Sequence, residues 1–218
     1  MGDAAFWINL TNKAGIISLL VAGVSGLVLF QRLPSGLRYL TGLAWFGLAV
    51  EIVSFLLKNR HQHNLFLIPI DAAGELWLLS LVYGWGLQWP AYSRVRPWVA
   101  GAFVLYAGAS GWLLSNSAQF TPALMVTESL LVLMLVGLYF RKLLQELRVQ
   151  RLSHDSMFWV STGVLLYFLG KLQIGLFSNY TMRHYSQELN LWMWTIHSLL
   201  LLILYSCYCL ALWTRPQK

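Results

Sequence analysis

The stretch Ile70-Asp71-Ala72-Ala73-Gly74-Glu75-Leu76-Trp77 decides the fold class of this chain. It places two carboxyl groups inside an apolar segment, residues 64–88, that is long enough to cross a bilayer as a helix. Asp71 and Glu75 are four residues apart, so they share one face of that helix. A charge at membrane depth is costly and persists mainly where it faces the interior of a bundle or a wet cavity. The stretch therefore predicts a membrane helix that contributes to an internal polar site.

The whole chain has the composition of an integral membrane protein. Of its 218 residues, 58% are hydrophobic and only 11% are charged, whereas soluble domains carry about 25% charged residues. So few charges would not cover a water-facing surface. The net charge of +7 gathers in the connections between apolar segments, so we interpret it as membrane topology and expect no nucleic-acid partner.

Seven apolar segments have the length of a spanning helix, which is about 17 to 25 residues. They are residues 13–31, 39–57, 64–88, 98–115, 121–140, 156–178 and 190–214. Turn-forming residues separate several of them, and we expect Pro90 and Pro97 to mark the connection between the third and the fourth. The prediction is a single all-α domain, residues 1–218, which forms a polytopic bundle of seven transmembrane helices in the lipid bilayer.

Basic residues divide the connections into two unequal sets, ten on one side and four on the other. The larger set is Arg32, Arg38, Arg94, Arg96, Arg141, Lys142, Arg148, Arg151, Arg215 and Lys218, and the smaller is Lys13, Lys58, Arg60 and Arg183. By the positive-inside rule, this predicts an N-terminus outside and a C-terminus in the cytoplasm. The basic stretch 141–155 is a candidate contact for a cytoplasmic partner, and equally for anionic lipid headgroups.

Five ionisable residues, one from each of five segments, lie at a similar distance from the predicted outer surface. They are Glu51, Asp71, Glu128, Lys171 and His197. Each is seven or eight residues from the outer end of its segment, which is about 10 to 12 Å at 1.5 Å per residue. Glu75 lies one turn deeper. We expect these side chains to converge on one polar pocket in the outer half of the bundle.

Each residue of this pocket has an expected role. Glu51, Asp71, Glu75 and Glu128 form the acidic lining. Lys171 is the internal counter-charge or an anchor for an anionic group of a ligand, and His197 is a hydrogen-bonding or titrating group. Trp77, Tyr167 and Trp194 are the candidate aromatic walls.

Four carboxyl groups face one lysine and one histidine in this pocket, and a bound proton or cation would neutralise the surplus negative charge. The alternative is that these groups only pair with one another and specify helix packing. We prefer a receptor-like or sensory protein that binds a small cationic or amphipathic molecule from outside, through charge pairing and cation–π contact. Seven helices with an outward N-terminus are similar in layout to seven-helix receptors. No cofactor is expected.

Two other functions fit the same residues. In an intramembrane metal-dependent hydrolase, Asp71, Glu75, Glu128 and His197 would be the metal ligands. In a proton- or cation-coupled transporter, the buried acids would relay the ion, and Pro69 would unwind the outer end of the third helix near the site. Whether the protein is an enzyme stays open, with binding preferred over catalysis.

Three stretches carry a resemblance to known proteins: NLFL (64–67), FWVSTGVLLYF (158–168) and LWMWTIHS (191–198). They resemble segments of small, uncharacterised bacterial seven-helix membrane proteins. The resemblance covers the third, sixth and seventh predicted helices. It implies a location in the bacterial inner membrane and carries no activity that can be transferred to this chain.

Overall fold

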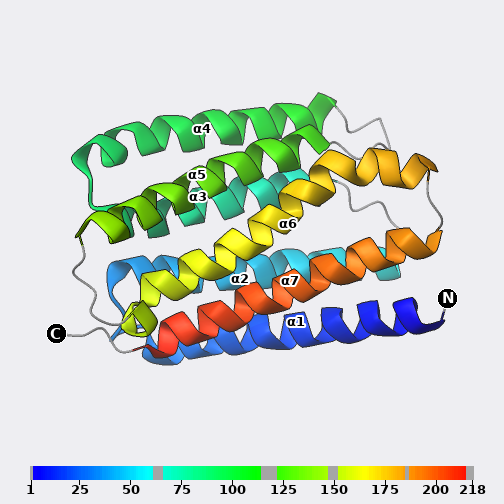
Figure 1. The fold of residues 1–218 in the computed structure, drawn as a ribbon, viewed down its shortest axis with the longest axis horizontal. Coiled ribbons are helices and arrows are strands. Elements are labelled where there is room, and N and C mark those ends of the chain that lie inside the picture. Colours follow the sequence, from blue (N-terminus) through cyan, green and yellow to red (C-terminus); the bar gives the residue numbers. More distant parts are fainter. Residues whose placement is uncertain (1, 61–65, 114–121, 147–151, 185–186, 215–218) are drawn as a thin grey trace.

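The computed structural model describes residues 2–60, 66–113, 122–146, 152–184 and 187–214. Within these ranges the chain forms seven α-helices and one short 3₁₀ helix, η1, and contains no strand (Figure 1). The elements are α1 (Gly2–Leu29), α2 (Ser35–Asn59), α3 (Leu67–Leu87), α4 (Pro90–Leu113), α5 (Pro122–Glu146), η1 (Leu152–His154), α6 (Ser156–His184) and α7 (Gln187–Trp213). The predicted all-α class is confirmed.

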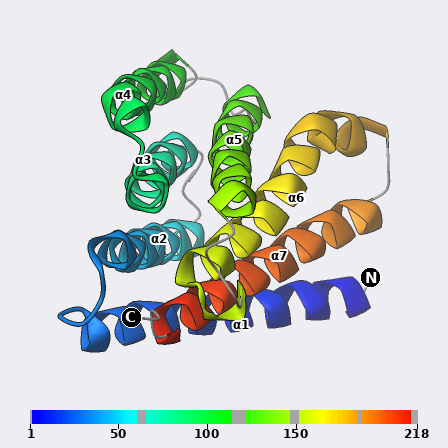
Figure 2. The same cartoon turned by 60° about the vertical axis from the view of Figure 1, so that its left-hand side comes forward.

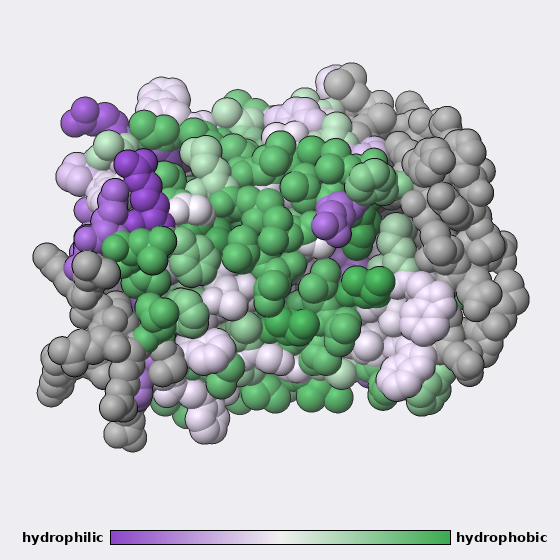
Figure 3. All heavy atoms as spheres, in the orientation of Figure 1, coloured by the Kyte–Doolittle hydropathy of each residue, from purple (hydrophilic) through white to green (hydrophobic). Residues whose placement is uncertain are grey.

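Five of the described helices are long and apolar enough to cross a membrane. The spans are Ser35–Leu57, Leu67–Leu87, Pro122–Glu146, Ser156–Phe177 and Leu191–Trp213. The apolar part of α1, Lys13–Leu29, is shorter, and α4 is not among the five. Figure 3 shows a broad hydrophobic band across the middle of one face, with hydrophilic residues gathered at one end. These features indicate a membrane protein.

Two helices begin well before the predicted segments. The first helix starts at Gly2 rather than at residue 13, and the fourth starts at Pro90 rather than at residue 98. Both differences have one cause: the prediction followed apolar residues, whereas a helix continues through polar residues as long as its hydrogen bonds continue. The predicted segment starts at residues 64 and 121 lie outside the described residues.

The prediction that two prolines mark the connection between α3 and α4 is confirmed for Pro90, which directly follows the non-helical residues 88–89, and is wrong for Pro97. Pro90 occupies the first position of α4, where a backbone N–H would have no helical acceptor. A single left-handed residue, Gln88 with φ 54°, closes α3 by donating its N–H to the carbonyl of Gly84. Pro97 lies inside α4, at the cost of one helical hydrogen bond.

A similar correction applies to Pro69 in α3. The helix begins at Leu67, so Pro69 falls in the first turn, whose N–H groups have no acceptor within the helix. From Leu67 onward α3 is a regular helix that includes Asp71. The predicted unwinding around Pro69 is therefore wrong for the described part of this helix.

Six of the helices form a closed ring. Contacts join α1 to α2, α2 to α3, α3 to α5, α5 to α6, α6 to α7 and α7 back to α1. The remaining helix, α4, packs on α3 outside the ring and touches α5 only slightly (Figure 2). The hydroxyl of Tyr92 in α4 donates a hydrogen bond to the carbonyl of Ser80 in α3 at 2.9 Å.

Two glycines allow close helix packing around the ring. A Cβ added at Gly74 in α3 would clash with the ring of Phe46 in α2, and one at Gly163 in α6 would lie 2.7 Å from the Cβ of Cys207 in α7. Real Cβ atoms do not approach neighbours this closely, so a larger residue at either position would force its neighbour to shift. The first contact brings α2 against the turn of α3 that carries the two carboxyl groups.

Candidate functional site

A buried ion triad joins three helices of the ring. The Nζ atom of Lys171 in α6 lies 2.9 Å from Oε2 of Glu75 in α3 and 3.0 Å from Oε2 of Glu128 in α5. Lys171 is 5% exposed and Glu128 is fully buried. Buried ions need close partners because desolvation is costly. Lys171 therefore occupies the internal counter-charge position expected from the sequence, and it is shared by two carboxyl groups.

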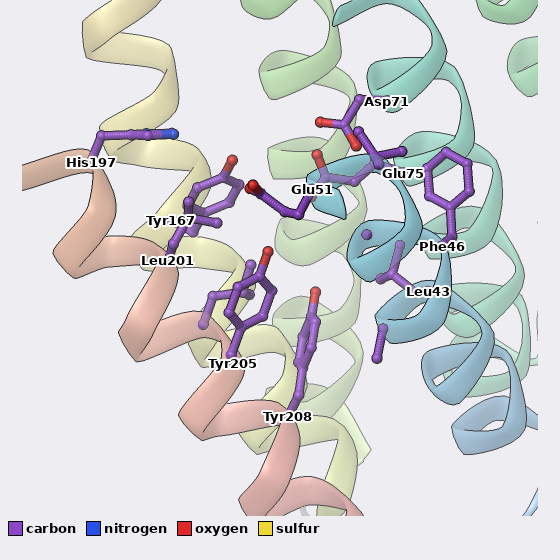
Figure 4. Close-up of a pocket in the computed structure, with 14 residues that line it drawn as sticks. Leu43, Phe46, Glu51, Asp71, Glu75, Tyr167, His197, Leu201, Tyr205 and Tyr208 are labelled. Atoms are coloured by element: carbon purple, nitrogen blue, oxygen red, sulfur yellow. The ribbon is translucent and has the colours of Figure 1, made fainter. Parts of the chain in front are cut away.

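A cavity of about 110 Å³ lies beside this triad, between α2, α3, α6 and α7 (Figure 4). An engineered apolar cavity of about 150 Å³ holds benzene, so this one admits a small molecule or a few waters. Its polar lining is Glu51, Asp71, Glu75, Tyr167, His197, Tyr205 and Tyr208, and its other lining residues include Leu43, Phe46, Leu201 and Leu204.

One wall of the cavity is acidic. Glu51 comes from α2, and Asp71 and Glu75 come from successive turns of α3. Glu51 keeps much of its surface exposed, which places it at the open edge of the cavity. Among the described residues, no basic side chain forms an ion pair with Glu51 or Asp71. The acidic wall therefore carries two carboxyl groups beyond those that pair with Lys171.

The opposite wall is aromatic and comes from α6 and α7. The ring of Tyr167 lies 5.6 Å from the imidazole of His197, and the indole of Trp194 meets that imidazole edge-on at 5.7 Å. Tyr205 and Tyr208 continue this wall along α7, and Figure 4 shows both hydroxyl groups directed toward the cavity. The hydroxyl of Tyr208 and Nδ1 of His197 are buried and have no hydrogen-bond partner among the described residues.

Most of the residues singled out in the sequence meet at this place. Glu51, Asp71, Glu75, Tyr167 and His197 line the cavity, while Lys171 and Glu128 form the ion triad beside it. Trp194 does not line the cavity and instead packs on the imidazole of His197.

The expected role of Trp77 as an aromatic wall is wrong. Its side chain is 43% exposed and does not line the cavity. Trp77 follows Glu75 by two residues, which is about 200° around a helix. A residue at this spacing cannot share the face of the carboxyl group.

Sequence analysis missed Tyr205 and Tyr208. Both belong to the face of α7 that starts at His197 and continues through Leu201 and Leu204 with spacings of three and four residues. Extending the histidine face by about three turns would have found both. The emphasis on charged residues directed attention away from tyrosine hydroxyls.

The arrangement gives no ligand set for the hydrolase alternative. Among the described residues, no three His, Cys, Asp or Glu side chains form a group that could hold a metal ion. Glu75 and Glu128 are engaged by Lys171, and His197 lies on the opposite wall from the acids (Figure 4).

Comparisons with known proteins add no relative: no family model, no curated protein and no solved structure matches this chain. The resemblance to small bacterial seven-helix proteins stays a prediction.

Proposed function

We propose that this protein is a receptor-like membrane protein that binds a small cation in the cavity between α2, α3, α6 and α7. One observation carries the proposal: Glu51 and Asp71 line the cavity without a basic partner among the described residues, while the nearby Lys171 is already held by Glu75 and Glu128. A cation bound in the cavity would balance the remaining negative charge of this wall.

The shape and chemistry of the opposite wall support the same class of ligand. Tyrosine rings attract cations through their electron-rich faces, and Lys171 already lies 5.5 Å from the ring centroid of Tyr167. A cavity of about 110 Å³ limits the ligand to a few non-hydrogen atoms, as the comparison with benzene indicates. The proposed ligand is thus a small organic ammonium compound.

The proposed membrane topology has seven spans, with the N-terminus outside and the C-terminus in the cytoplasm. It includes α1 and α4, which run alongside the other helices (Figure 1). The start of α1 and the end of α7 lie at opposite ends of the bundle (Figure 1), as an odd number of spans requires. The exposed side chains Trp98, Leu105 and Trp112 of α4 suit a lipid environment. In this topology the cavity opens toward the outside, and we place the protein in the bacterial inner membrane.

A cytoplasmic response would use the other end of the bundle. The ion triad joins α3, α5 and α6, so a cation that draws Glu75 away from Lys171 changes how these three helices are held together. The basic stretch 141–155 is the proposed contact for a cytoplasmic partner or for lipid headgroups. Residues 147–151 of this stretch lie outside the described residues.

Calorimetry on the detergent-purified protein tests the proposal. The probes are propylammonium and 1-propanol, which have the same number of non-hydrogen atoms and differ in charge. We expect only the ammonium compound to bind. Asp71→Asn should weaken binding by about tenfold to a hundredfold, because it removes a charged hydrogen-bond acceptor.

The matched control is Asp155→Asn, which makes the same chemical change at the start of α6, away from the cavity. Equal binding of the two probes would refute the proposal, as would equal effects of the two substitutions. Proton-driven uptake of propylammonium into proteoliposomes, lost in Asp71→Asn, would instead assign the site to the transporter class.

A further inference from the structure

We infer that the ligand carries two functional groups: an ammonium group for the acidic wall and a hydroxyl group for Tyr208. The inference rests on the proposed function and narrows it from small cations to short hydroxyalkylammonium compounds. The hydroxyl group of the ligand would exchange a hydrogen bond with the Tyr208 hydroxyl, while its ammonium group would bind the carboxyl groups of Asp71 and Glu51.

Tyr208 provides the observation that goes beyond the acidic cluster. Its side chain is 1% exposed, and its hydroxyl is buried with no hydrogen-bond partner among the described residues. The residue lines the cavity, and Figure 4 shows its hydroxyl directed toward the cavity interior. Buried hydroxyl groups in folded proteins are nearly always hydrogen-bonded, because leaving water without a new partner is costly. A partner inside the cavity meets this requirement.

The two polar ends of the cavity lie at different heights of the bundle. His197 and Tyr208 are 11 residues apart on α7, which is about 16 Å along the helix axis. The carboxyl groups lie nearer the level of His197, and the hydroxyl of Tyr208 lies below them (Figure 4). A volume of only about 110 Å³ limits a ligand that reaches both groups to a short chain.

Apolar side chains complete the lining. Leu43 from α2 and Leu201 and Leu204 from α7 line the cavity together with the polar groups. A short methylene chain that joins an ammonium group to a hydroxyl group matches a lining with acidic, apolar and phenolic parts. A ligand with an ammonium group alone would leave the Tyr208 hydroxyl unsatisfied, whereas a ligand with both groups satisfies each end.

Water is the alternative partner for Tyr208. A buried water typically makes about three hydrogen bonds to polar groups, and the neighbouring Tyr205 is one such group in the cavity. If water fills this role, the hydroxyl group of a ligand brings no advantage. The experiment therefore compares ligands with and without that group.

Calorimetry with three probes of equal size separates the possibilities. Ethanolammonium carries both groups, propylammonium carries the charge alone, and ethylene glycol carries no charge. We expect ethanolammonium to bind about tenfold more tightly than propylammonium, as one additional well-made hydrogen bond allows. The same preference is expected if the pair is lengthened by one methylene group, so that 3-hydroxypropylammonium is compared with butylammonium. In Tyr208→Phe this preference should fall to within about twofold.

Tyr83→Phe is the matched control. Tyr83 is also fully buried, but its hydroxyl donates a hydrogen bond to Oγ of Ser161 at 3.2 Å. Tyr83 does not line the cavity. The control should lose stability and keep the preference for ethanolammonium. The comparison of probes on the unmodified protein tests the inference even if Tyr208→Phe does not fold.

The outcomes distinguish this inference from the proposed function. Equal binding of the two ammonium probes to the unmodified protein would overturn the inference and leave the proposed function intact. Persistence of the preference in Tyr208→Phe would overturn the role of Tyr208. Binding of ethylene glycol as tight as that of both ammonium probes would refute the proposed function, and the inference with it.

Discussion

Replacing Lys171 with methionine should destabilise the bundle strongly. The change keeps the length and the apolar stem of the side chain but removes the ammonium group that Glu75 and Glu128 share. Both acids then remain inside the ring of helices without the partner that offsets their desolvation. The loss should appear as a lower free energy of unfolding and not as an altered fold.

The magnitude follows from the burial of the partners. Glu128 is fully buried, and the side chain of Glu75 is only 13% exposed. Removing one member of a buried ion pair typically costs about 3–5 kcal/mol, mostly because a charged group stays buried without a partner. Lys171→Met should therefore lower the free energy of unfolding by about 3–5 kcal/mol, a large part of the total stability of an ordinary domain.

A second variant tests the cause. Adding Glu75→Gln and Glu128→Met to Lys171→Met removes the uncompensated charges together with the ammonium group. Neutral replacement of a whole buried ion pair is often close to neutral in stability, so this triple variant should regain at least half of the loss. The assay is reversible unfolding in mixed micelles, followed by tryptophan fluorescence and circular dichroism.

Two results would refute this reasoning. Lys171→Met could unfold within about 1 kcal/mol of the unmodified protein, which would mean that the triad carries little of the cost assigned to it. Alternatively, the triple variant could be no more stable than the single one. The loss would then come from packing of the lysine stem and not from charge.

Three further predictions concern helix packing and helix ends. Gly163→Ala should lower the stability in thermal unfolding by about 1–3 kcal/mol, because the new methyl group would lie 2.7 Å from the Cβ of Cys207. The control is Gly108→Ala, where the added Cβ meets no other atom within 4 Å. This variant should be neutral or slightly stabilising. Asp155→Ala removes the carboxylate that caps the N-terminus of α6 and should cost about 1 kcal/mol, with faster hydrogen exchange in the first turn of α6. Lys142→Met frees two carbonyls at the C-terminus of α3 and should speed exchange at that end, at a cost of about 1–3 kcal/mol.

Each of these predictions has a contrary outcome. Equal thermal shifts for the two glycine variants would mean that the α6–α7 contact yields to the added methyl group. Unchanged exchange at the start of α6 would show that Asp155 does not determine that helix end. For the Lys142 variant, faster exchange throughout α3, and not only at its C-terminus, would contradict a local role for the lysine.

The sequence predicted the helices and the polar site for clear physical reasons. The length of the apolar segments is a strong constraint, so the helical class and most of the approximate positions were accessible. The depth of ionisable residues was equally informative, because a charge inside an apolar segment is costly unless it faces the bundle interior. Asp71, Glu75 and Lys171 meet in the structure for this reason.

The errors arose where depth alone does not determine direction. Trp77 lies near the depth of Glu75, but its angle around the helix turns it outward. Tyr208 carries no charge, so nothing in its composition distinguished it from the other tyrosines of the chain. Pro97 was interpreted as a turn residue, although it lies inside α4. Resolving these cases needs the neighbours of each helix, which one sequence does not specify.

The position of α4 outside the ring affects how the molecule opens. Removing a helix of the ring breaks at least two interfaces, whereas separating α4 breaks essentially one, its interface with α3. We therefore expect local opening to require the least free energy at α4, so that its amides exchange while the ring stays closed. Because α3 contacts α4 and also carries Asp71 and Glu75 of the cavity wall, we expect a displacement of α4 that moves α3 to move these carboxyl groups as well.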